Sequence, residues 1–185
     1  MIVISTCRRP TPRINSFVKD LCHSLRSCIV SPRGKTSLQD VIDSAIGKGA
    51  DRLVLVNGWK GEPGEIRPLR LEEGETQVAY PIISLREVKL RRDYGVKGRF
   101  VAEAVTASER KADVDLARSL ASLFDLPLRS RRGSFCSFHV AEDHSRRLAV
   151  NLTSPAATRE VGPGFVVRHL AWREGRCERY EERAS

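Results

Sequence analysis

The chain begins with MIVISTCRRPTPRINSFVKDL (residues 1–21), a stretch that decides how the fold starts. The apolar run Ile2–Ile4 predicts a buried strand. Thr11 is a suitable N-cap and Pro12 a suitable first helical residue, and apolar residues then recur at helical spacing. We therefore expect a helix over residues 12–27. A buried strand, a basic loop and an amphipathic helix in this order are typical of an α/β fold.

The same alternation continues through the first third of the chain. Ile29 and Val30 predict a short second strand, and LVLV at 53–56 predicts a third. Between them, Ser37 and Asp40 form the pattern of a capping box, which predicts the start of a second helix. Strands that alternate with helices favour a parallel sheet.

The rest of the chain predicts a second round of strands and one more helix. We expect a loop or weak hairpin over 57–75, which contains glycines and two prolines, and a strand over 78–84. A strand over 100–105 and a helix capped by Ser108 follow. The basic loop RSRRGS at 129–134 precedes further strands, which we expect at 135–140, 146–152, 165–172 and around 177–180.

The chain divides into two halves of similar order. Residues 84–99 are basic and end in two glycines, so we place the junction there, with halves of approximately 1–95 and 96–185. Each half has the order strand, helix, basic glycine-containing loop, and each alone offers little core. We therefore predict an α/β fold of two similar packed halves, a pseudo-duplication.

Composition narrows the class of protein. With 41% apolar and 30% charged residues, and apolar runs of strand length only, we expect a soluble globular chain without a membrane segment. The start MIVIST resembles no export signal, so we expect a cytoplasmic location. Five cysteines without zinc-type spacing predict neither a disulfide framework nor a metal site, and we expect no cofactor.

The charge points to a polyanionic partner. The chain has 32 basic and 23 acidic residues, a net charge of +9, and 25 arginines against 7 lysines. Arginine suits bidentate phosphate contacts, and neutralising phosphates releases counterions, so nucleic acid is the expected partner. The high share of arginine is equally explained by genome composition or heat adaptation. With eleven aromatic residues, most of them needed for the core, we expect backbone contacts to outweigh base recognition.

Two basic clusters are expected to meet at one edge of the sheet. Arg8, Arg9 and Arg13 follow the first strand, and Arg33 and Lys35 follow the second. The carboxyl ends of parallel strands share an edge, and each cluster precedes a helix N-terminus with its free N–H groups. The sequence therefore predicts a phosphate-binding cradle.

An enzymatic alternative uses the same loop. Cys7 and Arg13 have the Cys-x5-Arg spacing of low-molecular-weight, Cys-dependent phosphatases, in which a thiolate attacks phosphorus. Such loops need consecutive inward N–H groups, and Pro10 and Pro12 remove two of them. The spacing remains, but the physical requirements of the loop disfavour this alternative, so we expect no enzyme activity.

Three blocks of the sequence resemble the Brix-domain proteins of ribosome biogenesis, and the length suits the short archaeal type. The blocks are STCRRPTPRINSFVKDL, RGKTSLQDVIDSAIGKGADRLVLVN and EVGPGFVVRHLAWREG. The resemblance implies one Brix-type domain over 1–185, whose two halves are each like the anticodon-binding domain of class IIa aminoacyl-tRNA synthetases.

The resemblance also implies a function. It implies a non-catalytic factor in rRNA processing and subunit assembly, which binds ribosomal RNA or its precursor, with other ribosome-assembly proteins as further partners. An interaction scaffold within the pre-ribosome remains an alternative. The family motif falls on the residues of the predicted cradle: Arg8, Arg9, Arg13, Arg33 and Lys35. Arg131 and Arg132 join the candidate RNA-binding residues on the local basic loop alone.

Overall fold

The computed structural model describes all residues except 73–74, 131–134, 144–146, 155–158, 174–175 and 180–185, and only the backbone of 159 and 176–179. The elements in chain order are β1 (Ile2–Thr6), α1 (Pro12–His23), β2 (Cys28–Ser31), α2 (Leu38–Gly47), β3 (Arg52–Trp59), β4 (Glu62–Glu72), β5 (Glu75–Val78), β6 (Ile82–Lys89), the 3-10 helix η1 (Arg91–Tyr94), β7 (Ala104–Ala107), α3 (Lys111–Phe124), β8 (Ser137–Glu142), β9 (Leu148–Ser154), β10 (Arg159–Arg173) and β11 (Arg176–Arg179). None of the described helices is long and apolar enough to cross a membrane.

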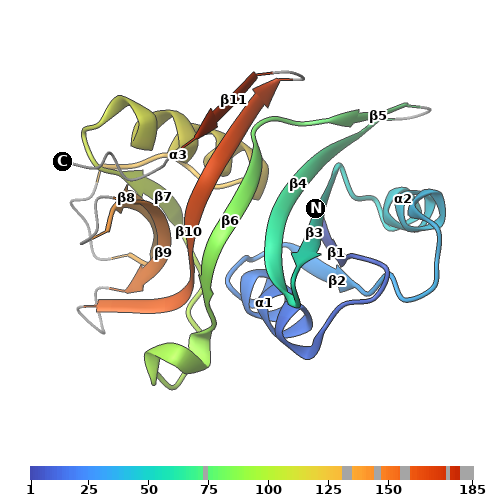
Figure 1. Cartoon of the computed structure of the whole chain (residues 1–185), viewed down its shortest axis with the longest axis horizontal. Helices are drawn as coiled ribbons and strands as arrows, with labels where there is room; N and C mark the ends of the chain where they lie inside the picture. The colour runs from blue at the N-terminus through green and yellow to red at the C-terminus, as the bar shows by residue number, and fades with distance from the viewer. Residues whose placement is uncertain (73–74, 131–134, 144–146, 155–158, 174–175, 180–185) are drawn as a thin grey trace.

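The strands form one mixed sheet. Its order is β2-β1-β3-β4-β6-β10-β9-β8-β7, with β5 beside β4 and β11 beside β10 (Figure 1). The parallel sheet predicted for the first third is confirmed, because β1 pairs in parallel with both β2 and β3. β7 and β8 are also parallel, whereas β3, β4, β6, β10, β9 and β8 are joined by antiparallel pairings. The protein is therefore mixed α/β with a central sheet, and the antiparallel pairing of β6 with β10 joins its two sides.

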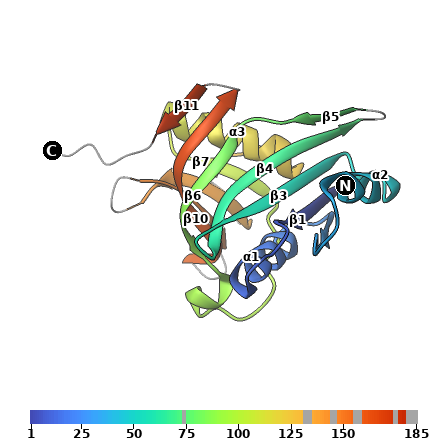
Figure 2. The ribbon, with the colours of Figure 1, turned by 45° about the vertical axis from the view of Figure 1, so that its right-hand side comes forward.

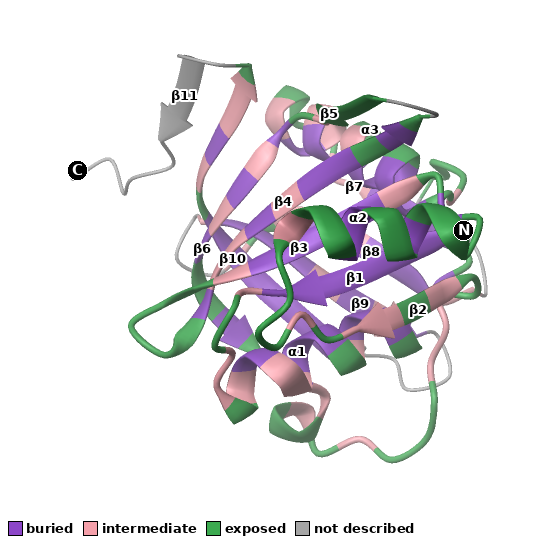
Figure 3. Ribbon diagram, turned by 90° about the vertical axis from the view of Figure 1, so that its right-hand side faces the viewer, coloured by how far each residue is buried: buried purple, intermediate pink, exposed green. Residues whose placement is uncertain are grey.

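The helices lie on both faces of the sheet. α1 and α3 contribute to one large core that includes Phe17, Leu120 and Phe165, whereas α2 packs through Val41 and Ile42 on a smaller core. In Figure 2, β1 lies between α1 and α2. Figure 3 shows α2 in front of β1 and β3, with its outward side exposed. Because the large core runs from α1 to α3, the two halves bury their apolar residues together.

The segment 57–75, expected to be a loop or weak hairpin, is instead mostly strand. β3 runs to Trp59, and β4 begins at Glu62 after a turn of Lys60 and Gly61, which have φ of 50° and 86°. Positive φ at both turn residues is typical of a tight hairpin. The glycines and prolines do not break the strand, because β4 has a bulge near Gly64, and Pro68 lies where its neighbour changes from β6 to β5.

Other boundaries differ by a few residues. The expected strand over 78–84 is divided into β5 and β6, and β6 continues to Lys89 inside the expected junction. α1 ends at His23 rather than at residue 27, and β7 begins only at Ala104 rather than at residue 100. The cap predicted at Ser108 is wrong, because the N-cap of α3 is Arg110.

Candidate nucleic-acid interface

Three loops share the carboxyl edge of the parallel strands. In the register of the sheet, Ser5 of β1 pairs with Ser31 of β2, and Thr6 pairs with Val56 of β3. The loops after these strands, and the turn between β3 and β4, therefore leave the sheet on the same side. The structure thus brings the two predicted clusters to one edge. The basic residues of residues 7–13, 32–37 and 60–61 are Arg8, Arg9, Arg13, Arg33, Lys35 and Lys60, and these segments hold no acidic residue.

Arg8 and Arg9 are exposed in the first loop, between β1 and α1. Neither guanidinium has an ion pair or hydrogen bond to any described residue. The loop itself is held at both ends. The backbone N–H of Cys7 donates to the Val56 carbonyl over 3.0 Å, and the Thr11 hydroxyl donates to the Gly61 carbonyl over 2.7 Å. The two arginines are thus presented to solvent from a fixed backbone.

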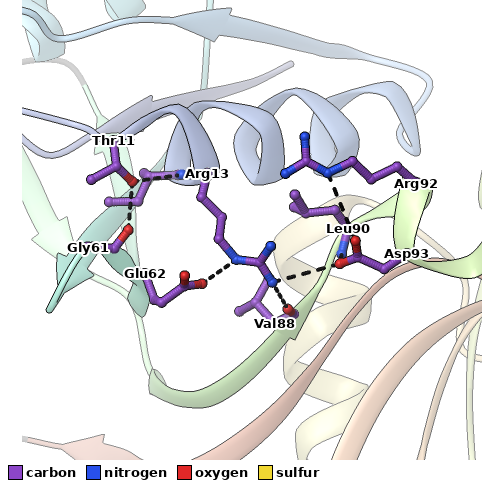
Figure 4. A network of polar contacts seen from close by, with 9 residues as sticks. Thr11, Arg13, Gly61, Glu62, Val88, Leu90, Arg92 and Asp93 are labelled. Atoms are coloured by element: carbon purple, nitrogen blue, oxygen red, sulfur yellow. Dashed lines mark hydrogen bonds and ion pairs between the residues drawn. The ribbon is translucent and has the colours of Figure 1, made fainter.

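Arg13, from the same loop motif, is placed differently (Figure 4). Its Nε is paired with the Glu62 carboxylate, and its Nη2 donates to the Val88 carbonyl over 2.8 Å. The same Nη2 lies 3.7 Å from an oxygen of Asp93. The side chain is only 32% exposed. Arg13 therefore ties the first turn of α1 to the start of β4 and the end of β6.

The second loop carries one steadied and one free cation. The Arg33 Nε donates to the Thr36 carbonyl over 3.2 Å, whereas Lys35 is exposed without a partner in the described chain. The α2 N-terminus is occupied, because Asp40 accepts from the Ser37 N–H over 3.1 Å and from its hydroxyl over 2.6 Å. Both bonds lower the pKa of Asp40, and the bond from the Ser37 hydroxyl has the larger effect. The positive end of this helix is thus already balanced by a carboxylate.

The N-terminus of α1 is more open to an anion. The Thr11 hydroxyl accepts from the Ile14 N–H over 3.3 Å, and no acidic side chain lies in the first turn. Of the two helix N-termini in the predicted cradle, that of α1 is the one without a negative charge. It is also the one that follows Arg8 and Arg9.

The second-half candidates lie outside the described residues. Arg131 and Arg132 fall in 131–134, so their positions stay a prediction. Arg129, just before them, stacks its guanidinium 5.5 Å from the centre of the Phe135 ring. Arg110, in the loop before α3, is paired with Glu142.

The geometry around Cys7 does not favour phosphoryl chemistry. The N–H of Cys7 is used in the bond to β3, and prolines stand at positions 10 and 12. Arg13, which such a mechanism would need on the phosphate oxygens, is occupied by Glu62, Val88 and Asp93. The loop therefore lacks the ring of inward donors that holds a transferred phosphate.

Trp59 is a candidate residue of the interface that the sequence did not reveal. It is 64% exposed, the largest exposed fraction among the described large hydrophobic side chains, and it ends β3 at the turn beside Gly61. The expectation of a loop over 57–75 concealed it. The sequence signal that could have revealed it is the pair Lys60-Gly61, which predicts a hairpin turn because it stands between two runs of strand-forming residues.

Comparison with known proteins places the chain among relatives. It matches no family model. A protein of Thermococcus kodakarensis described as a probable Brix domain-containing ribosomal biogenesis protein is 28% identical over 202 aligned positions, 98% of this chain and 96% of the relative. An Aeropyrum pernix protein of the same description is 33% identical over 130 positions, 69% of this chain and 71% of the relative.

Two solved structures of archaeal proteins have the same fold as this chain. The crystal structure of a probable ribosomal biogenesis protein from Aeropyrum pernix superposes with a TM-score of 0.73 at 25% identity, over 97% of this chain and 98% of that one. Mil, an archaeal Imp4-like protein, shares the fold with a TM-score of 0.66 at 20% identity, over 92% of this chain and 99% of its own. The extent of the Aeropyrum pernix match shows that this chain belongs to the Brix domain-containing ribosomal biogenesis proteins.

Proposed function

We propose that this chain is a non-catalytic factor of ribosome biogenesis that binds ribosomal RNA or its precursor at the carboxyl edge of β1, β2 and β3. The observation that carries the proposal is the set of three loops with basic residues and no acidic ones at that edge. Such a concentration of cations favours a phosphodiester backbone through counterion release. The descriptions of the relatives support the setting of ribosome biogenesis.

The proposed role of each cation depends on whether its side chain already has a partner within the protein. Arg8, Arg9 and Lys35 are exposed and unpartnered within the described chain, so they hold phosphates directly. Arg33 is steadied by the Thr36 carbonyl and joins them. Arg13 acts as a brace that holds the loop in position, because its guanidinium already has three partners. Arg131 and Arg132, which lie outside the described residues, stay candidates for further RNA contacts from the second half.

The protein does no chemistry on the RNA in this proposal. The arrangement offers cations and helix N–H groups, which fix the position of a backbone, and the loop of Cys7 lacks the donors of a phosphatase. We further propose that the protein works in the cytoplasm.

We also infer that the halves, approximately 1–95 and 96–185, are copies of one α/β unit like a class IIa anticodon-binding domain. The pairings support this. Residues 127–129 lie parallel to β7, since Val105 N–H donates to Pro127 and Arg129 N–H donates to Val105, both over 2.9 Å. The order 127–129, β7, β8, β9, β10 then repeats the order β2, β1, β3, β4, β6.

The test of RNA binding compares two edges of one sheet. A structured ribosomal RNA fragment is titrated with wild type, with Arg8→Ala/Arg9→Ala, and with Arg26→Ala/Lys48→Ala. The last pair removes the same charge from the loops after α1 and α2, at the opposite edge, where both residues are exposed. We expect affinity to fall only in Arg8→Ala/Arg9→Ala.

The salt dependence identifies the cause of the loss. Each lost phosphate contact shallows the slope of log affinity against log salt by about 0.7 to 0.9, so the first pair should lose roughly 1.4 to 1.8 units. Equal losses in both pairs would mean nonspecific attraction to a basic protein. Unchanged affinity in both would remove the RNA surface from this edge, and the scaffold alternative would then take its place.

A further inference from the structure

The turn between β3 and β4 presents one large aromatic ring to solvent. Trp59 is 64% exposed although it belongs to a strand whose other large apolar residues are buried. Leu53 and Leu55 pack with α2, so the alternation of a strand places Trp59 on that same face of the sheet. The loop that carries Arg33 and Lys35 leads into α2, which packs on this face.

The backbone under the ring is held from two sides. The two-residue turn has positive φ at Lys60 and Gly61, and the Gly61 carbonyl accepts from Thr11 of the basic loop over 2.7 Å. At the bulge of β4, a Cβ on Gly64 would lie 2.5 Å from the Trp59 Cβ, so only glycine permits this approach. A ring on such a fixed backbone loses little freedom when a ligand covers it.

The charged residues around Trp59 indicate which kind of ligand would bind there. Lys60 is its neighbour in sequence, and Arg8 and Arg9 lie on the loop that is bonded to the same turn. Ser31 at the end of β2 lies level with Leu55 of β3, two strand spacings or about 10 Å away, and the loop of Lys35 continues from there toward the edge at which β3 ends. The nearest acidic residue in sequence, Glu62, is engaged by Arg13. A flat apolar ring among cations matches a nucleobase with its phosphates.

We propose that Trp59 is a stacking platform for one unpaired base of the bound RNA. The inference rests on the proposed function and adds to it the class of RNA, a single-stranded loop or end. Bases inside a duplex are already stacked and offer no free face, whereas an unpaired base stacks readily on an aromatic side chain. The cations hold the backbone, and the ring selects strands that can turn a base outward.

The fluorescence of Trp59 itself provides the test. The chain has two tryptophans, and Trp172 packs against the large core, so Trp172→Phe leaves Trp59 as the single tryptophan and keeps an aromatic ring in place of Trp172. This variant is titrated with a short single-stranded ribosomal RNA oligonucleotide and with a duplex of the same composition. We expect quenching by the single strand and little change with the duplex.

Affinity measurements then separate stacking from charge. Trp59→Ala should weaken single-strand binding by about 5- to 150-fold, the range of base stacking, while Trp59→Phe keeps most of the affinity. The salt slope should stay unchanged in both, because no charge is lost. Duplex binding should also stay unchanged. Thermal melting checks that the variants remain folded, and the fluorescence titration of Trp172→Phe, which keeps Trp59, decides the test if Trp59→Ala does not fold.

Other outcomes distinguish the two proposals. If RNA binds with the salt dependence assigned to Arg8 and Arg9 but Trp59→Ala binds like wild type, the stacking platform is overturned and the RNA-binding function stands. If wild type binds no RNA, the proposed function itself fails. If Trp59→Ala instead abolishes self-association and leaves RNA affinity intact, the ring belongs to a protein contact, and the stacking proposal is again overturned.

Discussion

Replacing Arg13 by alanine should destabilise the protein, although its neighbours Arg8 and Arg9 can be replaced without loss of stability. The Arg13 guanidinium joins three elements through Glu62, Val88 and Asp93. The two ion pairs are partly exposed, and such pairs contribute about 0 to 1 kcal/mol each. The hydrogen bond to the Val88 carbonyl comes from a charged donor and contributes about 1.5 to 3 kcal/mol.

The middle values of these ranges sum to roughly 3 kcal/mol. In a chain of this size, each kcal/mol lowers the melting temperature by about 2 to 4 °C, so Arg13→Ala should melt about 6 to 12 °C below wild type. Arg13→Lys should recover little, since one ammonium group lacks the fork that reaches Glu62 and Val88 together. Circular dichroism melts of both variants give the comparison.

The matched control is Arg8→Ala/Arg9→Ala, whose melt should stay close to that of wild type because neither side chain has a partner among the described residues. The reasoning is refuted if Arg13→Ala melts like wild type while its RNA affinity falls as far as that of the control. Arg13 would then be a phosphate contact and not a brace.

Three further predictions test the fold and its charges. Because the bond from the Ser37 hydroxyl lowers the pKa of Asp40, the stability it confers is fully present above the pKa of the unfolded carboxyl and is lost as pH falls through the lower folded value. The difference in melting temperature between wild type and Asp40→Ala should therefore be widest near neutral pH and close in acid. Gly164→Ala should lower stability by about 1 to 3 kcal/mol, measured by urea unfolding, because its Cβ would overlap the Asn151 side chain. Phe17→Ala should lower stability by about 3 to 5 kcal/mol while calorimetry still shows a single transition, since Phe17 is fully buried in the core that both halves share.

The first layer of the fold was predictable because its signals are local. The apolar spacing of α1 predicted a helical face on which Ile14, Phe17 and Leu21 are all buried. The predicted end of that helix was wrong for an instructive reason. Leu25 is only 2% exposed, but it lies in the turn after α1. The apolar spacing therefore continues past the residue at which the helix ends. Periodicity indicates which residues are buried and does not by itself locate a helix terminus.

The strand β4 was not predictable, because its prolines and glycines are tolerated through distant pairings. Pro68 needs no donor where the neighbouring strand changes, and Gly64 fits a bulge. Neither position can be recognised before the register of the sheet is known.

The candidate site shows the same limit. Arg8, Arg9 and Arg13 look alike in the sequence, yet Arg13 alone has its charge balanced, by Glu62, which lies 49 residues away, and by Asp93. The sequence predicted where the cations gather and could not predict which of them remain free.

The charges around the N-termini of α1 and α3 differ. β7 leads into α3 as β1 leads into α1, but in the second half Arg110 is paired with Glu142. The first turn of α3 also holds Asp113, a fully buried residue bonded by the Ser108 hydroxyl. A carboxylate at a helix N-terminus occupies the place that an anion would take. The corresponding turn of α1 has no acidic residue, and its preceding loop keeps two free arginines. If the halves are copies of one unit, an ion pair and a buried carboxylate occupy this position in the described part of the second copy, whereas the same position in the first copy is open to an anion.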